Sequence, residues 1–338
     1  MRVKKGEPRV SAPGSVHASL MNAGAMPFGN SQASAARELI LLGLAEDIGT
    51  GGDVTTQALI PESQSGAVQI VARAPGVLAG LPVASLVFTQ VDPSIVLMPL
   101  AADGDWLAVG QVVAEISGKV GSLLTGERTC LNFLTHLSGI ATMTRRYVDA
   151  VAGTRAGIYD TRKTLPGWRV LEKYAVAAGG GKNHRMGLHD MILIKDNHLA
   201  GWQAAAPDHS IAAGVQAARA WTAARAGLPL QIEVEVDTLA QLEEALCGEP
   251  DMVLLDNMTL ADMRQAVALR DARAPDVELE ASGGVSLATV AAIAATGVER
   301  ISVGALTHSS PALDLAFDWN TDYMTAFEKE RKRNTNEH

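Results

Sequence analysis

The fold follows from two segments of similar design, residues 157–164, GIYDTRKT, and residues 191–198, MILIKDNH. In each segment a short apolar run is followed at once by charged and polar side chains. Apolar runs of this length, bounded by Gly or polar residues, are typical of strands buried on both faces of a parallel sheet. The two segments therefore predict parallel strands whose ends carry functional groups.

The stretch that joins these segments is basic, although the chain as a whole is acidic. Between Arg155 and Lys195 eight Lys or Arg residues stand against three acids, whereas the whole chain has 28 basic and 37 acidic residues. A third polar cluster, residues 183–188 (NHRMGL), lies within it. Basic groups just past strand ends indicate a pocket for a small, multiply charged anion. Ordinary loop charge is the alternative for any one of these residues, and it explains three such clusters less well.

Further apolar runs near 231–236, 252–255, 277–281 and 300–303 alternate with helical patterns and start 21, 25 and 23 residues apart, which is the spacing of βα units. Such units form an open doubly wound sheet or a (β/α) barrel. A barrel is favoured because strand after strand ends in reactive or Gly-rich residues, and barrel strands bring their carboxyl ends to one mouth. We predict an α/β chain, with an N-terminal α+β domain followed by an open (β/α) barrel of about six strands.

Four regions are expected along the chain. Residues 1–35, rich in Ala, Gly, Ser and Pro and without the apolar core of a signal peptide, are expected to be a disordered extension. Residues 36–140 form the N-terminal α/β domain, 141–310 the barrel, and 311–338 a C-terminal helix and tail. The longest helical pattern, 121–150, spans the boundary between the first two folded regions.

Composition excludes several classes of protein. A net charge of −9 counts against a nucleic-acid surface, and 47% hydrophobic with 19% charged residues describes a well-cored soluble chain. No apolar run approaches the length of a membrane span, so no membrane partner is expected. Cys130 and Cys247 lie far apart, which predicts neither a disulfide framework nor a zinc site and fits a reducing cytoplasm.

Carboxylates follow the central strands. Glu233 and Glu235 alternate with apolar residues and so share one face of their strand, and Asp256 closes the next strand. A Glu and an Asp from adjacent strands, opposite a basic cluster, can hold hydrated Mg²⁺ with its phosphate ligands. The alternative is neutralisation of a buried lysine, which we favour for Glu233; which of the two glutamates faces the site stays open.

Two Gly-rich strand ends and one arginine complete the candidates. Ser282-Gly283-Gly284 and Ser302-Val303-Gly304 leave backbone N–H groups beside a following helix, as in the phosphate sites of barrels. Arg128 falls in the apolar part of the long helix, where an unpaired cation is costly. Three explanations for an arginine at this position are an ion pair within the helix near Glu127, a side chain that extends to solvent, and donation to the pocket of a neighbouring subunit.

These motifs together resemble the quinolinate phosphoribosyltransferase family, also called nicotinate-nucleotide pyrophosphorylase (carboxylating). The resemblance covers roughly Leu39 to Leu313 and rests on ordered motifs, among them GERT at 126–129, DTRKT at 160–164, GGGKNHR at 179–185, LIKDNH at 193–198, EVEV at 233–236, LLDN at 254–257, EASGG at 280–284 and SVGALTH at 302–308. One departure is residues 201–210, which look like an inserted loop near the pocket.

The resemblance implies a type II phosphoribosyltransferase-like fold and transfer of a phosphoribosyl group from phosphoribosyl pyrophosphate (PRPP) to quinolinate. The products are nicotinate mononucleotide, CO₂ and pyrophosphate, and the reaction belongs to de novo NAD biosynthesis. It also implies Mg²⁺ as cofactor and a homodimer, or a higher oligomer, with the long helix at the interface and Arg128 donated to the partner's site.

The resemblance also assigns the site residues. Lys163, Glu235 and Asp256 are the expected catalytic residues, the last two with the metal, directly or through water. The expected substrate-binding residues are Arg128, Thr161, Arg162, Lys163, His184, Arg185, Lys195, Glu235, Asp256, Ser282, Gly283, Gly304 and His308.

Three other functions remain as alternatives. A paralogue associated with molybdenum transport would share the scaffold, and a barrel lyase would use Lys163 or Lys195 as a Schiff base. A non-catalytic protein would bind quinolinate without turnover.

Overall fold

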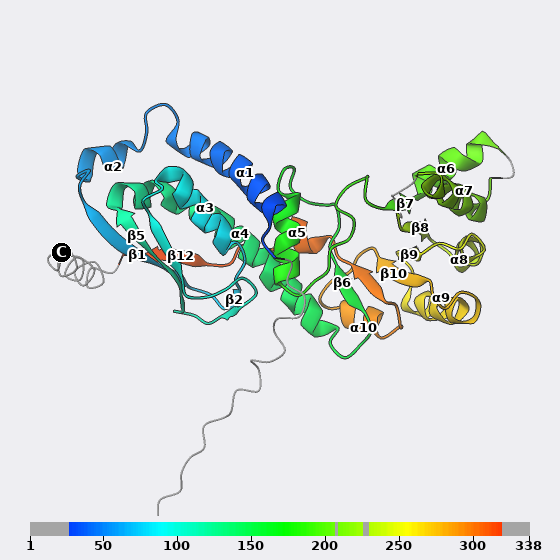
Figure 1. Ribbon diagram of the computed structural model, residues 1–338. Coiled ribbons are helices and arrows are strands. Elements are labelled where there is room, and N and C mark those ends of the chain that lie inside the picture. The colour runs from blue at the N-terminus through cyan, green and yellow to red at the C-terminus, as the bar shows by residue number, and fades with distance from the viewer. Residues whose placement is uncertain (1–26, 207–208, 226–229, 320–338) are drawn as a thin grey trace, which may run out of the picture.

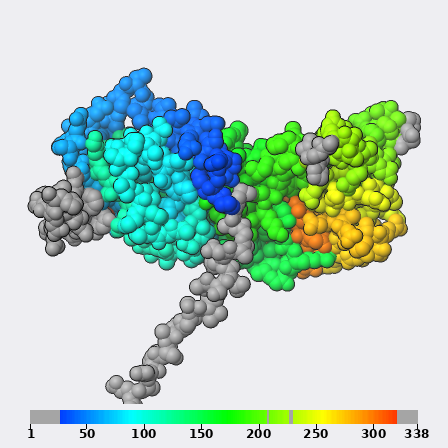
Figure 2. Space-filling model, in the orientation of Figure 1, coloured from blue at the N-terminus to red at the C-terminus, as the bar shows by residue number. Residues whose placement is uncertain are grey.

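The computed structural model describes residues 27–206, 209–225 and 230–319. Two parts lie side by side, one built on an antiparallel sheet and the other on a parallel sheet (Figure 1). The helix α4 (Val120–Ala150) contacts elements of both parts and joins them. In Figure 2 the blue-to-cyan N-terminal part and the yellow-to-orange part occupy opposite ends of the molecule, with green residues between them.

The N-terminal part is a four-stranded antiparallel sheet with helices packed on it. The strand order is β12 (Leu315–Asp318), β1 (Ser65–Ala72), β5 (Val112–Lys119) and β3 (Val96–Pro99). Helices α1 (Asn30–Ile48), α3 (Leu81–Val91) and α4 pack on one another, and α3 and α4 contact the sheet. The short helix α2 (Val54–Leu59) and the paired strands β2 (Gly76–Val77) and β4 (Trp106–Leu107) complete this part.

The two ends of the chain differ from the expectation. Helix α1 begins at Asn30, inside the region expected to be an extension, and residues 1–26 of that region lie outside the described residues. Leu315–Asp318 forms a strand where a helix was expected, because its backbone pairs antiparallel with the edge of β1 and Leu315 and Phe317 are buried. The remainder of the expected tail, from 320 onward, lies outside the described residues.

The C-terminal part is a parallel sheet of six strands, as the apolar runs predicted. The order is β6 (Gly157–Tyr159), β11 (Arg300–Ser302), β10 (Glu278–Ser282), β9 (Met252–Asp256), β8 (Ile232–Val236) and β7 (Ile192–Ile194). Strands β6 and β7 form the two edges, and within the described residues no strand pairing closes the sheet between them. The sheet is therefore an open barrel.

Helices lie between consecutive barrel strands along the chain, and the last of them follows β11. They are α5 (Arg169–Ala178), α6 (Asp196–Ala205), α7 (Ile211–Ala223), α8 (Leu239–Leu246), α9 (Leu260–Arg273), α10 (Val290–Ala294) and α11 (Ala305–His308). Residues 201–205, expected in an inserted loop, extend α6. The Trp202 ring stacks on His209 at 3.7 Å between centroids, and Trp202 Nε1 donates to the Ser210 carbonyl, so His209 and Ser210 contact the helix.

Candidate active site

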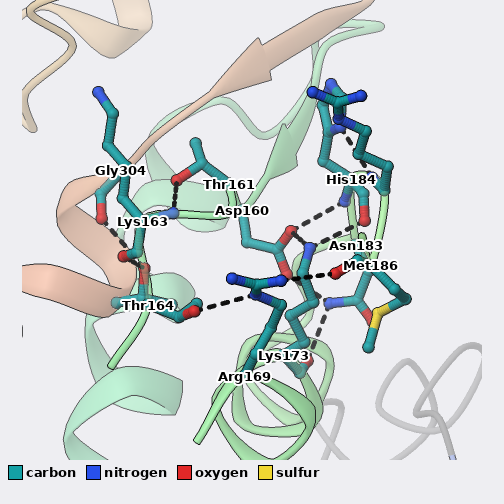
Figure 3. A network of polar contacts seen from close by, with 12 residues as sticks. Asp160, Thr161, Lys163, Thr164, Arg169, Lys173, Asn183, His184, Met186 and Gly304 are labelled. Atoms are coloured by element: carbon teal, nitrogen blue, oxygen red, sulfur yellow. Dashed lines mark hydrogen bonds and ion pairs between the residues drawn. The ribbon is translucent and has the colours of Figure 1, made fainter. Parts of the chain in front are cut away.

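The loop after β6 rests on a buried ion pair. Lys173 of α5 pairs with Asp160, and the two side chains are 1% and 0% exposed. Asp160 also accepts hydrogen bonds from Asn183 Nδ2 (2.6 Å) and from the His184 N–H (2.9 Å), as Figure 3 shows. Burial raises the pKa of Asp160 and lowers that of Lys173, and the charge of each partner opposes the shift of the other. The network joins the loop after β6 to residues 183–185, so two of the basic clusters lie together.

Two arginines from these clusters lie near each other with unused hydrogen-bonding capacity. Arg162 Nε is buried and has no hydrogen-bond partner among the described residues. Burial first, and then the positive charge of Arg162, lower the pKa of Arg185. Arg185 Nη1 donates to the Met191 carbonyl at 3.3 Å. A buried, unpaired donor beside a second cation is an arrangement that an anion between them would stabilise.

Lys163 points away from the buried ion pair and past Gly304 (Figure 3). Its backbone is fixed at both ends, because its N–H donates to Thr161 Oγ1 (3.0 Å) and its carbonyl accepts from Thr307 Oγ1 (2.8 Å). A Cβ atom at Gly304 would lie 3.1 Å from both Lys163 Cδ and His308 Nε2. The exposed Lys163 therefore lies with Gly304 and His308, whereas the sequence had grouped it with Arg162, His184, Arg185 and Lys195.

Lys195 and two carboxylates occupy the neighbouring strand ends. Lys195, which follows β7, forms an ion pair with Glu235 of β8, and its side chain remains 41% exposed. Glu235 of β8 pairs with Leu254 of β9, so these two side chains point to the same face of the sheet. Asp256 is two residues after Leu254 and therefore also points to that face. Glu235 is thus the nearer of the two β8 glutamates to the mouth.

His184 points into the barrel rather than into the open mouth. Its Nε2 lies 3.0 Å from Glu233 Oε2 and 3.4 Å from Glu280 Oε1, and both carboxylates are fully buried. Its Nδ1 accepts the Arg185 N–H at 2.7 Å. The partner of Glu233 is therefore this histidine, and the expected buried lysine is wrong. Both ring nitrogens of His184 are engaged by the protein itself.

In this buried cluster, burial and the neighbouring charges shift the pKa values in opposite directions. Burial opposes charge on His184, but its hydrogen bond to Glu233 and the nearby carboxylate of Glu280 raise the pKa of His184 to about 9. Burial and the charge of Glu280 raise the pKa of Glu233, whereas His184 and Arg300 lower the pKa of Glu280 against its burial.

The Gly-rich end of β10 packs against the end of β9. Gly283 has φ 93°, and a Cβ there would lie 2.1 Å from Asn257 Oδ1, so only glycine fits. The Ser282 carbonyl accepts the Asn257 N–H at 3.0 Å. Helix α10 begins only at Val290, so the helix expected directly after these glycines is not there. Gly304, in contrast, directly precedes α11.

Arg128 is exposed on α4, so the desolvation cost inferred from its apolar neighbours does not arise. Within the described residues it makes no hydrogen bond or ion pair with the barrel residues named above. Glu127, suggested as its partner, accepts instead from Trp319 Nε1 at 3.2 Å.

Several residues that support the site were not predicted from the sequence. Glu172 accepts the Leu165 N–H and contacts His136 Nε2 at 2.9 Å, and Arg300 Nε donates to Glu280 Oε2 at 2.8 Å. Glu280 could have been predicted, because β10, like β8, has two glutamates separated by one apolar residue.

Comparison with known proteins gives matches along nearly all of the described chain. Residues 53–138 match the family model of the quinolinate phosphoribosyl transferase N-terminal domain, and residues 140–318 match that of the C-terminal domain. The nicotinate-nucleotide pyrophosphorylase [carboxylating] of Mycobacterium leprae is 49% identical over 84% of this chain and 97% of its own length. The probable enzyme of the same name from Bacillus subtilis is 44% identical over 81% and 89%.

A solved structure gives the same result. The nicotinate-nucleotide pyrophosphorylase of Francisella tularensis superposes with a TM-score of 0.77 at 37% identity, covering 84% of this chain and 96% of its own. Among the described residues, the helices are too short or too polar to cross a membrane.

Proposed function

The chain belongs to the quinolinate phosphoribosyltransferase family, and we propose that its barrel mouth catalyses transfer of the phosphoribosyl group of PRPP to quinolinate with loss of CO₂. This makes it a pentosyltransferase of de novo NAD biosynthesis.

The observation that carries the proposal is the pair Arg162 and Arg185. Quinolinate has two adjacent carboxylates on a flat ring, and planar guanidinium groups bind carboxylates through paired N–H donors. Arg162 Nε is a buried donor without a partner, and the two cations lie close enough to lower the pKa of Arg185. A dicarboxylate between them supplies the missing acceptor and offsets the repulsion. Lys163 and Lys195 add positive charge at the neighbouring strand ends.

The phosphoribosyl group belongs beside the carboxylates of β8 and β9. The pyridine nitrogen forms its bond to the ribose C1 as the bond from C1 to the pyrophosphate oxygen breaks, and the electron pair leaves with pyrophosphate. Glu235 and Asp256 lie on one face of the sheet, where negative charge stabilises the developing positive charge on the ribose. Lys163, exposed beside Gly304 and His308, is suited to the negative charge of the phosphate groups.

The donor set fits a hydrated magnesium ion. Two carboxylates, one of them already paired with Lys195, are too few for an all-protein site, but Mg²⁺ commonly takes one or two carboxylates with water and phosphate oxygens. Glu235 and Asp256 would hold the ion through such waters, and it would screen the charge of the pyrophosphate.

Decarboxylation follows from the new bond to nitrogen. The ring nitrogen becomes positively charged, so the electron pair left at C2 when its carboxylate departs as CO₂ is stabilised beside that charge. The carbon then takes up a proton, giving nicotinate mononucleotide. Exclusion of water by a second subunit would protect the ribosyl group from hydrolysis.

A homodimer is part of the proposal. Arg128 is exposed and unpaired on α4, within the described residues, which is the state expected of a side chain offered to the partner's site. A reducing, cytoplasmic setting is supported by the two free cysteines, Cys130 and Cys247.

The test is formation of nicotinate mononucleotide from quinolinate and PRPP, first with Mg²⁺ and then with EDTA. Metal-dependent product supports the proposal. Quinolinate binding without product by a folded protein would favour the non-catalytic alternative. A borohydride-trapped substrate adduct would favour the lyase, although Lys195 is paired with Glu235 and Lys163 is exposed.

A further inference from the structure

The barrel interior carries a layer of charge where an apolar layer would be more stabilising. Glu233 of β8, Glu280 of β10 and Arg300 of β11 are all buried, and His184 enters from the loop before β7 to contact both glutamates. Burying charge is costly, and replacing buried ion pairs by apolar side chains often stabilises a protein. A layer of this kind below a candidate substrate site therefore suggests a role other than stability.

A chain of contacts leads from the barrel strands to Arg185. Arg300 stacks on the Tyr159 ring at 3.7 Å and donates to Glu280. Glu280 and Glu233 hold Nε2 of His184, and Nδ1 of His184 in turn accepts the backbone N–H of Arg185. His184 thus fixes the position at which the Arg185 side chain leaves the backbone.

We propose that Glu233 and Glu280 are positioning residues for quinolinate recognition, which they support by holding His184 and, through it, Arg185. His184 accordingly acts through Arg185 and not as a direct ligand of a quinolinate carboxylate, because both its ring nitrogens already have protein partners. This inference rests on the proposed function, since it concerns how the same site binds its dicarboxylate.

A metal ion is the competing reading of the cluster. His184, Glu233 and Glu280 each place one ligand atom within 4.8 Å of the others. Arg300 Nε, however, already supplies a positive charge to Glu280, through its Oε2.

The experiment compares Glu280→Gln with Glu278→Gln. Both residues lie on β10 and both contact Arg300, but Glu278 is exposed and has no contact with His184. For Glu280→Gln we expect the KM for quinolinate to rise about tenfold while the KM for PRPP stays within about twofold. For Glu278→Gln both constants should stay within about twofold. Combining His184→Asn with Glu280→Gln should give no larger effect than His184→Asn alone, because Glu280 acts through His184.

Three results would overturn the inference. One is a quinolinate KM for Glu280→Gln like that of wild type, and another is an equal rise in both KM values, which a merely structural role predicts. The third is a stoichiometric metal ion in purified wild type that Glu280→Gln lacks. If Glu280→Gln does not fold, Glu233→Gln is judged by the same criteria. Calorimetric titration measures the affinity of each variant for quinolinate, so it tests the inference even if wild type forms no product. Absence of product would count against the proposed function alone.

Discussion

Lys173 and Asp160 form an ion pair inside the barrel domain, with neither side chain more than 1% exposed. The pair also holds the backbone of His184 from both sides, since Asp160 accepts its N–H and Lys173 donates to its carbonyl. The loops that carry Arg162 and Arg185, the proposed ligands of quinolinate, therefore both depend on one buried contact.

Lys173→Met should destabilise the protein by about 3–5 kcal/mol, because it leaves Asp160 buried without a counter-charge. Urea unfolding followed by circular dichroism measures the change. The double variant with Asp160→Asn should cost less than the sum of the two single variants. Strict additivity would show that the pair is not coupled.

Arg162→Met should separate binding from stability. Removing one of two neighbouring cations relieves repulsion in the free protein, so the unfolding midpoint should be unchanged or higher. The kcat/KM for quinolinate should fall by at least about tenfold, because a charged hydrogen bond contributes about 1.5–3 kcal/mol. A lower midpoint together with unchanged kinetics would contradict the assignment of Arg162.

Lys163→Ala should remove more than about 2 kcal/mol of transition-state stabilisation, since the charge acts on the phosphate groups as they leave. Steady-state kinetics with saturating Mg²⁺ measure it. Its backbone hydrogen bonds with Thr161 and Thr307 do not involve the side chain, so the melting temperature serves as the folding control. A kcat/KM within about threefold of wild type would remove Lys163 from the catalytic residues.

Gly283→Ala should destabilise the end of β10 by more than about 1–3 kcal/mol, because the new Cβ adds a clash with Asn257 to the strain of a positive φ. Gly153→Ala is the matched control, with φ 83° and open space around the position of its Cβ. The two variants are compared by thermal unfolding. Equal losses would mean that backbone strain alone, without contact with Asn257, accounts for the effect.

The barrel strands could be predicted because local pattern reveals them: β6, β7 and β9 are short apolar runs that end at polar residues, and β8 and β10 alternate apolar residues with glutamates. Strand β12 could not, because Leu315–Asp318 becomes a strand only by pairing with β1, which is remote in the sequence. Local sequence carries no information about that edge.

The same limit applies within the site. The positions of Lys163, Lys195 and Asp256 near strand ends were predictable, because Lys195 directly follows β7, Asp256 is the last residue of β9 and Lys163 lies in the loop after β6. The inward direction of His184 was not, because it depends on carboxylates from β8 and β10 that meet only when the barrel forms. The exposure of Arg128 was also missed, since the helix side on which a residue lies depends on what packs there.

The pairing of β1 with β12 also has a consequence for the order of events during translation. The ribosome makes β1 early, but the strand that covers its edge is added only after every strand of the barrel has been made. The N-terminal sheet consequently stays one strand short while the barrel emerges, and an unpaired strand edge is a site of non-native association. The nascent N-terminal half therefore has to be kept apart from other chains until residue 318 has left the exit tunnel.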